Sequence, residues 1–338
     1  MKKGRGERIA VVGGGSWGTA FSAMLSARNG DVSLWVREPE VCEAIRDRRE
    51  NTVFLPGVKV PEEVRPSTDP AEALEGRGVV ALAVPSQYLR GVAERIGPHI
   101  AREAVLVSLA KGLENGTLLR MTQVLEQAVP THRGRLAVLS GPTFAREVAA
   151  GMPSGATVAS EDRAVAAALQ AAFSGKCFRV YAGTDVVGIE IGAALKNVMA
   201  IAAGMSDGLG FGHNARALLV TRGLAEISRV GIRLGADPQT FYGLSGLGDL
   251  VLTCTGDLSR NRTVGMRVGG GERVEDVLSG MRMVAEGVET SHAAIDLSRR
   301  TGVSMPISEQ VHRILHEGKD AREAVTELLS RALRQEKD

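Results

Sequence analysis

A glycine-rich turn at residues 13–18 constrains this chain more than any other feature. It reads Gly-Gly-Gly-Ser-Trp-Gly, follows the apolar run at 9–12 directly and opens a helical pattern. A G-x-G-x-x-G turn between a strand and a helix is typical of a site that binds a dinucleotide pyrophosphate. Gly13 would allow the tight turn, Gly15 would let the backbone approach the anion, and Gly18 would let helix and strand pack closely. The alternative is a glycine-rich turn that binds nothing.

Up to about residue 184, short apolar runs alternate with helical patterns. The run at 79–84 is apolar throughout, as expected for a parallel strand that is covered on both faces. This alternation predicts a doubly wound parallel sheet of the Rossmann type, because parallel strands need helical crossovers. The expected strands are 8–12, 31–36, 79–84, 104–109, 136–139, 155–159 and 178–181, and the expected helices are 17–28, 39–48, 87–96, 117–128 and 162–173.

From about residue 185 onward, strand-like runs become scarce and helical patterns follow one another. We expect these helices at 185–205, 214–233, 260–268, 288–301 and 306–317. At roughly 150 residues per domain, 338 residues are enough for two domains. The prediction is a nucleotide-binding domain at 1–184 and a mostly α-helical substrate-binding and catalytic domain at 185–338, with a cleft between them.

Charge and composition exclude several kinds of partner. The 41 Lys and Arg residues nearly balance the 39 Asp and Glu residues, which leaves a net charge of +2. A nucleic-acid or membrane-surface binder would show a clear basic surplus, and the 4% aromatic content offers few stacking platforms. We therefore expect small-molecule substrates and no nucleic acid. We also expect no membrane insertion, since no run approaches about 18 apolar residues. The size of the helical domain suggests a possible homodimer.

The three cysteines give no sign of a disulfide or a metal site. Cys42, Cys177 and Cys254 are widely spaced, form no CxxC pair and have no histidines at zinc-ligand spacing. We therefore expect reduced thiols in a cytoplasmic protein and no metal. Cys254 could be a nucleophile, but no positioned base is visible, and a packed thiol is the favoured interpretation.

The second expected strand leads to Arg37, where an NAD site would place an acidic residue to bind the ribose 2′-hydroxyl. A guanidinium suits a 2′-phosphate because it offers several planar, charged donors. We therefore expect NADP to be favoured over NAD. Glu38 follows immediately and could partly neutralise that preference, and a solvated charge at a strand end is the alternative interpretation of Arg37.

Two of the eight lysines lie in apolar surroundings. Lys111 ends the run at 104–110, at the carboxyl end of an expected strand, where open α/β sheets bind ligands. Lys196 lies within a helix of small and apolar residues, and burial there would lower its pKa toward neutrality. Such an amine can serve as general acid and base. The alternatives are that Lys196 reaches the surface or pairs with Glu190.

Three polar loops could meet these lysines. Residues 140–143 follow an expected strand and open a helix, and the glycine-punctuated segment 245–249 carries one carboxylate, Asp249. Residues 259–262 read Ser-Arg-Asn-Arg, an N-cap serine followed by a basic first turn. Cations are unfavourable at a helix N-terminus unless an anion binds there, so this is a candidate phosphate site. Each segment taken singly could be a structural cap.

Seven motifs follow one another over nearly the whole chain: GGGSWGTA at 13–20, VSLAKGLE at 107–114, LSGPTFA at 139–145, GAALKNVMAIAAG at 192–204, GLGDLVLTC at 246–254, SRNR at 259–262 and AEGVET at 285–290. In this order and spacing the chain resembles the bacterial-type NAD(P)-dependent glycerol-3-phosphate dehydrogenase family. The resemblance implies reversible hydride transfer between NAD(P)H and C2 of dihydroxyacetone phosphate. The product would be sn-glycerol 3-phosphate for glycerophospholipid synthesis.

The resemblance also implies roles for individual residues. Lys196 matches the catalytic residue that gives a proton to the nascent alkoxide and takes it back in oxidation. Lys111 matches a lysine that contacts both cofactor and substrate. The other positions that match substrate-binding residues are Gly141, Thr143, Asp249, Ser259, Arg260 and Asn261. Besides the three turn glycines, the positions that match cofactor-binding residues are Ser16, Trp17, Arg37, Ala145, Arg260, Val284 and Glu286.

Two other functions share some of these features. A lysine-dependent dehydrogenase of the β-hydroxyacid type would have the glycine turn and the helix lysine, but the segments at 246–250 and 259–262 argue against it. A dinucleotide-sensing module that reports redox state to a partner would keep the glycine turn and have no use for a lysine in an apolar helix.

Overall fold

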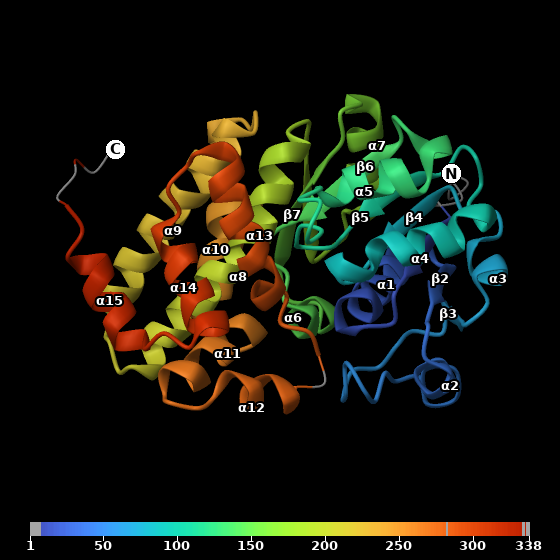
Figure 1. Cartoon of the computed structure of the whole chain (residues 1–338). Coiled ribbons are helices and arrows are strands. Elements are labelled where there is room, and N and C mark those ends of the chain that lie inside the picture. Colours follow the sequence, from blue (N-terminus) through green and yellow to red (C-terminus); the bar gives the residue numbers. More distant parts are fainter. Residues whose placement is uncertain (1–7, 282, 333–334, 336–338) are drawn as a thin grey trace.

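The structure is a computed structural model that describes residues 8–281, 283–332 and 335. A β-sheet covered by helices forms one side of the molecule, and a group of helices forms the other (Figure 1). The sheet and its helices come from the first part of the chain, and the helical group comes from the second part.

Within the described residues, eight strands form one sheet in the order β3-β2-β1-β4-β5-β6-β7-β8. The order reverses between β1 and β4, which creates the switch point where ligands bind in open α/β sheets. The strands are β1 (Ile9–Val12), β2 (Val32–Trp35), β3 (Val64–Ser67), β4 (Val79–Leu82), β5 (Val105–Ser108), β6 (Leu136–Ser140), β7 (Ser154–Ala159) and β8 (Phe178–Gly183).

The prediction of a doubly wound sheet is confirmed, but the sheet is not wholly parallel. β6 and β7 pair antiparallel, with Val138 opposite Ala159, while every other neighbouring pair is parallel. Residues 141–153 leave the carboxyl end of β6 and carry only the short helix α6 (Ala145–Ala149) before β7 begins. The chain therefore re-enters the sheet at the end where β6 finished, and β7 runs in the opposite direction to β6.

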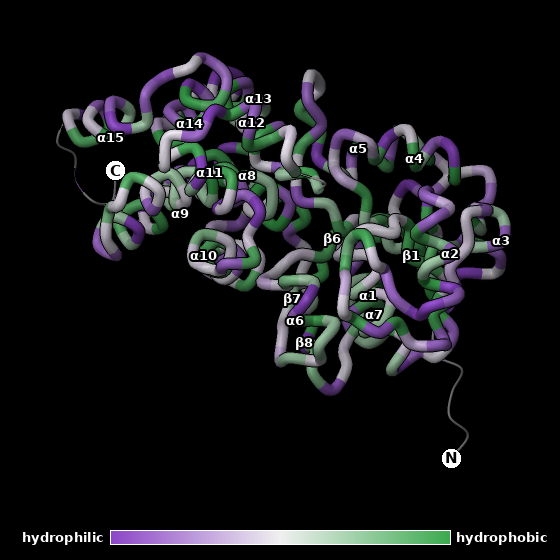
Figure 2. The backbone as a smooth tube through the Cα atoms, turned by 90° about the horizontal axis from the view of Figure 1, so that it is seen from below, coloured by the Kyte–Doolittle hydropathy of each residue, from purple (hydrophilic) through white to green (hydrophobic). Residues whose placement is uncertain are grey.

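Helices cover both faces of the sheet. Phe21 and Phe173 pack with β1 in one buried cluster, and Leu89 and Leu125 pack with the other face of the sheet. Strands β1 and β6 are hydrophobic along their length in Figure 2, as two-sided burial requires. The remaining helices of this part are α1 (Ser16–Asn29), α2 (Pro39–Arg48), α3 (Pro70–Leu74), α4 (Leu89–Ile96), α5 (Met121–Ala128) and α7 (Arg163–Phe173).

The second part is built around α8 (Val186–Gly208), which contacts α9, α10, α11, α13 and α14. Asp185 caps its start by accepting a hydrogen bond from Gly188 N at 2.8 Å. The helices around it are α9 (His213–Arg233), α10 (Asp249–Thr255), α11 (Arg260–Gly269), α12 (Val274–Ser279), α13 (Glu286–Thr301), α14 (Pro306–Glu317) and α15 (Ala321–Leu329).

The expectation that the chain holds no long apolar segment was wrong for α8. This helix is long and apolar enough to cross a membrane by length and composition. However, 94% of its apolar window is buried inside the protein. Its hydrophobic surface is covered by the helices around it, which makes α8 the core helix of the second part.

All ten expected helices and seven of the eight strands are present near their predicted positions. The helix expected to open after residues 140–143 is α6, and the sequence analysis missed the edge strand β3, the short helices α3, α10 and α12, and the terminal helix α15. It also placed residues 245–249 in a loop, whereas Leu244–Gly248 forms a single π-helical turn that continues into α10.

Candidate active site

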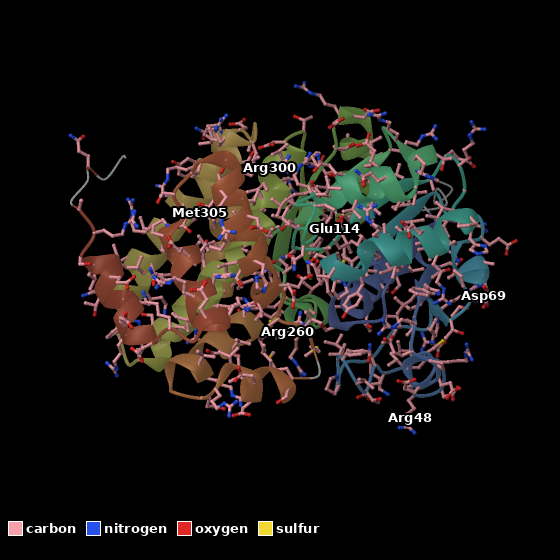
Figure 3. All side chains as sticks on the ribbon, viewed as in Figure 1. Arg48, Asp69, Glu114, Arg260, Arg300 and Met305 are labelled. Carbon is pink, nitrogen blue, oxygen red and sulfur yellow. The ribbon has the colours of Figure 1, made fainter. Side chains whose placement is uncertain are left out.

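A cavity of about 350 Å³ lies at the carboxyl ends of β1, β2 and β4. The glycine turn forms one wall, and residues from the helical part close the opposite side. Figure 3 shows Arg260 at the boundary between the helices and the sheet. Of the residues expected to bind a cofactor, those that line this cavity are Gly13, Gly15, Ser16, Trp17, Arg37, Arg260, Val284 and Glu286.

The glycine turn has the form that a dinucleotide requires. Gly13 has φ +116°, and a Cβ there would lie 2.5 Å from Ala83 O. A Cβ at Gly18 would lie 1.9 Å from Gly13 O, so Gly18 is the residue that lets α1 pack against the turn. A Cβ at Gly15 would meet nothing within 4 Å, which leaves open space for an anion at the start of α1. The turn and the open space at Gly15 together fit a bound dinucleotide.

Arg37 and Glu38 form an ion pair at the edge of the cavity. Arg37 Nη2 donates to Glu38 Oε1 at 2.6 Å, and Arg37 Nε donates to the same oxygen at 2.9 Å. The Arg37 side chain is 63% exposed. The guanidinium is thus within reach of a ligand, and it is partly neutralised by its neighbour.

Two lysines share one buried carboxylate beside the cavity. Lys111 Nζ lies 2.7 Å from Asp249 Oδ2, and Lys196 Nζ lies 2.6 Å from Asp249 Oδ1. Lys111 follows Ala110, which lines the cavity, and its ammonium also donates to Gly141 O at 3.0 Å. The strand end of β5, the middle of α8 and the start of α10 therefore meet at one point.

Lys196 is held so that part of its ammonium stays available. It donates to Asp249 and, at 2.7 Å, to Thr253 Oγ1. The Thr253 hydroxyl itself donates to Asp249 O at 2.6 Å, so it accepts from the lysine. An ammonium has three donors, and among the described residues only two of those of Lys196 are engaged.

Burial sets the protonation of this group. The Lys196 side chain is 5% exposed, and desolvation with the nearby Lys111 charge outweighs Asp249 and lowers the pKa of Lys196 to about 8. Burial alone would raise the pKa of the Asp249 carboxyl, but Lys111 and Lys196 outweigh it and lower that pKa. Asp249 is thus an anion between two cations.

The structure rejects both alternatives for Lys196. The residue is buried, so it does not reach the surface. Glu190 instead accepts from Arg120 Nη1 at 2.5 Å and from Thr122 N and Oγ1 at 2.8 and 2.7 Å.

The sequence analysis found Asp249 as a carboxylate near the lysine but missed that it bridges both lysines, and it missed Thr253. An i, i+4 relation between Asp249 and Thr253 on one helix was the available signal.

A second hydrogen-bonded chain links the lysine pair to the cavity wall. Asn197 Nδ2 donates to Lys111 O at 2.9 Å, and its Oδ1 accepts from Asn261 Nδ2 at 3.0 Å. Asn261 Oδ1 in turn accepts from Gly287 N at 3.0 Å, next to Glu286. This chain fixes α8, α11 and the start of α13 relative to one another. Asn197 has a part in the site that the sequence analysis did not assign.

The predicted phosphate site has the expected cap. Ser259 Oγ accepts from Arg262 N at 3.2 Å and begins α11, and Arg260 points into the cavity without a salt bridge to any described residue. Burial raises the pKa of the Glu286 carboxyl, while Ser86 N and the charges of Arg260, Lys111 and Lys196 oppose that rise. The cavity and the lysine pair therefore lie within electrostatic range of each other.

Four predicted residues remain to be placed: Gly141, Thr143, Ala145 and Cys254. Gly141 is buried with φ +156°, and Thr143 Oγ1 donates to Gly141 O at 3.1 Å. Ala145 begins α6 and does not line the cavity. Cys254 is buried, and burial raises its pKa to about 12, so the interpretation as a packed thiol is confirmed.

Together, the doubly wound sheet, the dinucleotide turn and the lysine pair define a dinucleotide-dependent oxidoreductase. The particular family follows from comparison with known proteins. The chain belongs to the NAD-dependent glycerol-3-phosphate dehydrogenase family, whose N-terminal model matches residues 8–166 and whose C-terminal model matches residues 185–326. The resemblance seen in the sequence motifs is thereby confirmed.

Individual relatives agree with this assignment over their full length. A glycerol-3-phosphate dehydrogenase [NAD(P)+] of Syntrophotalea carbinolica is 53% identical over 331 residues, which cover 98% of this chain and 99% of the relative. One from Geobacter sulfurreducens is also 53% identical, with the same coverage. The crystal structure of glycerol-3-phosphate dehydrogenase from Coxiella burnetii has a TM-score of 0.92 at 37% identity and covers 97% of this chain and 100% of that one.

Proposed function

We propose that this protein is an NAD(P)-dependent glycerol-3-phosphate dehydrogenase that interconverts dihydroxyacetone phosphate and sn-glycerol 3-phosphate. Family membership over nearly the whole chain supports this proposal. The observation that carries it is the buried ammonium of Lys196, which has one donor left beside a dinucleotide cavity. We assign residues 1–184 to nucleotide binding and residues 185–338 to substrate binding and catalysis.

Reduction of the ketone needs one hydride and one proton. When bound, NAD(P)H supplies the hydride to C2 of dihydroxyacetone phosphate, and the carbonyl π electrons move to the oxygen. Lys196 then donates its free N–H proton to that oxygen, which forms the alcohol and leaves a neutral amine. In the oxidation direction the neutral amine takes the hydroxyl proton. A pKa of about 8 gives Lys196 access to both forms near neutral pH.

The neighbours of Lys196 prepare it for this role. Asp249 and Thr253 hold the ammonium in one orientation, so little reorganisation accompanies proton transfer. Lys111 adds a second positive charge near the oxygen that becomes negative, and Asp249 keeps the two cations compatible. We assign Gly141, Thr143 and Asn261 to the substrate as well. Gly141 O accepts from Lys111 and from Thr143, and Asn261 is joined to Lys111 O through Asn197.

Arg260 and the amides at the start of α11 are our assignment for the substrate phosphate. A dianionic phosphate is stabilised by a guanidinium and by a helix N-terminus, and Ser259 fixes that terminus. The cofactor contacts we propose are the glycine turn with Ser16 and Trp17, then Arg37, Lys111, Arg260, Val284 and Glu286, and Ala145 is left out because it does not line the cavity. NADP is the proposed preference because the exposed guanidinium of Arg37 lines the cavity and suits a 2′-phosphate, and the ion pair with Glu38 limits that preference.

Replacement of Lys196 tests the function. The K196A variant should lose about 10²- to 10⁴-fold in turnover of dihydroxyacetone phosphate while its affinity for NADPH is kept. The matched control is K176A, which removes an exposed lysine and should leave turnover unchanged. Turnover is followed by the loss of reduced-nicotinamide absorbance, with NADPH and NADH compared side by side.

The outcomes separate the rival functions. An unchanged rate in K196A would remove this residue from the mechanism. A wild-type protein that binds NADPH but turns over neither dihydroxyacetone phosphate nor any hydroxyacid would indicate a dinucleotide sensor. Turnover of 3-hydroxyisobutyrate-like acids in place of dihydroxyacetone phosphate would indicate the β-hydroxyacid type.

We also propose a cytoplasmic location, a supply role in glycerophospholipid synthesis, and a homodimer. The reaction class supports the first two, because both substrates are small and charged. The homodimer rests on the size of the helical part. Light scattering on the purified protein would test the dimer, and a mass equal to one chain of 35.7 kDa would contradict it.

A further inference from the structure

Three histidines converge on the surface of the helical part, and none of them lines the nucleotide cavity. His292 lies on α13, and His312 and His316 lie on α14, which packs beside it (Figure 1). The four-residue spacing of His312 and His316 places both on one face of α14. One ligand nitrogen from each ring lies within 4.8 Å of the other two.

One nitrogen–nitrogen separation in this cluster is close to that between two ligands of a metal ion. His312 Nε2 lies 3.1 Å from His292 Nδ1. Zn–N bonds of about 2.0–2.1 Å at a tetrahedral ion place two ligand nitrogens roughly 3.3 Å apart. The third ring packs against this pair: the His292 and His316 ring centroids are 3.8 Å apart with planes 31° from parallel, and those of His312 and His316 are 4.8 Å apart, so binding one ion needs the His316 ring to turn toward the other two.

Outer partners determine which ring nitrogens in this cluster carry the lone pair. The Ser291 hydroxyl donates to Val288 O at 2.6 Å, so it must accept from His316 Nε2 at 2.8 Å. That bond leaves His316 Nδ1 with the lone pair. Similarly, Glu317 Oε1 lies 3.5 Å from His312 Nδ1 and favours a proton there, which leaves the lone pair on Nε2. Metal-binding histidines are oriented by such hydroxyl and carboxylate partners.

We infer that His292, His312 and His316 bind one Zn²⁺ ion, with a fourth position left to water. Three imidazoles favour zinc over Mg²⁺ or Ca²⁺, which prefer oxygen ligands. The ion would join α13 to α14 and thereby stabilise the helix whose first residue, Glu286, lies in the nucleotide cavity. This proposed site differs from the expectation of no metal. That expectation rested on the spacing of histidines from the cysteines and did not take account of His312 and His316, which lie four residues apart.

Zinc titration of the metal-stripped, untagged full chain tests the site. All proteins carry C177S, because Cys177 is an exposed thiol that could bind zinc by itself. By calorimetry, the parent should bind a single equivalent of Zn²⁺, and H312A and H316A should each lower the affinity at least about tenfold. H99A removes an exposed histidine on another element and is the matched control; its affinity should equal that of the parent.

Two further measurements keep the test decisive. Zn²⁺ should raise the melting temperature of the parent and leave that of the H312A/H316A double variant unchanged, because only a folded-state ligand stabilises the fold. Co²⁺ in the parent should give the intense visible bands of a tetrahedral ion. An absence of saturable binding, or equal affinity in the double variant, would overturn the proposal and leave a hydrogen-bonded histidine cluster.

Discussion

A buried carboxylate that faces two ammonium groups is the residue-level basis of this site. Asp249 has both oxygens engaged by lysines, and all three side chains are largely removed from water. Desolvation disfavours a charged Lys196, and the second lysine disfavours it further, while Asp249 acts in the opposite direction. The balance lowers the pKa of Lys196 to about 8 instead of suppressing its charge altogether.

This balance predicts opposite pH dependences for the two directions of the reaction. Lys196 is an ammonium below its pKa and an amine above it, so kcat/KM for ketone reduction should fall as pH rises through about 8. The corresponding value for oxidation should rise through the same range. Initial rates in both directions on one protein preparation provide the measurement. Profiles that stay flat between about pH 7 and pH 9 in both directions would contradict the assignment of Lys196.

A second residue-level prediction concerns the choice of cofactor. Glu38 neutralises Arg37 and presents a negative charge near the expected 2′-phosphate. E38Q removes the charge at nearly constant size, so the ratio of kcat/KM for NADPH over NADH should rise by about tenfold, or about 1.4 kcal/mol. E40Q is the control, because Glu40 is exposed on α2 and does not line the cavity. An unchanged ratio in E38Q would show that Arg37 does not contact the 2′ group.

At the scale of elements, hydrophobic pattern predicts the buried strands and misses the edge strand. β1 and β4 are buried at every position, and continuous apolar runs identify them. β3 contains Arg65 and Pro66 and lies at the edge of the sheet, where a missing N–H and an exposed side chain are tolerated. Its pattern therefore resembles a loop. The antiparallel direction of β7 depends on the path of residues 141–153, which periodicity does not encode.

Glycines in the second part misled the prediction for a different reason. Residues 244–248 contain two glycines but form a helical turn, and a Cβ at Gly246 would lie 2.3 Å from Phe241 O. The glycine is there for close packing and not for a loop. Only the neighbouring backbone reveals this, so the sequence alone could not separate the two interpretations.

The same kind of close packing joins the two helices that carry Lys196 and Arg260. A Cβ at Gly265 on α11 would lie 2.0 Å from Ile201 O on α8. G265A should therefore force the helices apart and lower the free energy of unfolding by about 3 kcal/mol, measured by urea denaturation. The matched control is G91A in α4, where a Cβ meets nothing within 4 Å. That variant should be neutral or up to about 1 kcal/mol more stable, and equal loss in both variants would contradict the packing argument.

At the scale of the whole molecule, the site exists only where the two parts of the chain meet. Lys111 comes from the sheet, Lys196 and Asp249 come from the helices, and 138 residues separate Lys111 from Asp249. The sequence motifs identified these residues one at a time, because each lies at a strand end or a helix start with a local signature. Their common meeting point depends on tertiary contacts between the parts, which no local pattern contains.

A buried ion pair holds these parts together away from the cavity. Arg120 precedes α5, and its guanidinium contacts the Glu190 carboxylate on α8, which also accepts two bonds from Thr122. Burial alone raises the pKa of the Glu190 carboxyl, and the Arg120 charge with the Thr122 bonds opposes that rise. All the hydrogen bonds that the described residues make to this carboxylate come from donors, so both of its oxygens are needed as acceptors.

Replacing Glu190 by Gln should weaken the contact between the parts. The amide would turn an NH₂ group toward Arg120 or Thr122, which are themselves donors, so E190Q should lose about 2–3 kcal/mol of unfolding free energy. E289Q is the control, because exposed Glu289 bonds Asn115 Nδ2 across the same boundary at 3.0 Å. The amide of this variant keeps an oxygen that can accept from Asn115, and the position is exposed to solvent, so the loss of unfolding free energy should be below about 0.5 kcal/mol. Urea denaturation of both variants measures the difference, and equal losses would show that burial of the Glu190 contact contributes nothing to holding the sheet and the helices together.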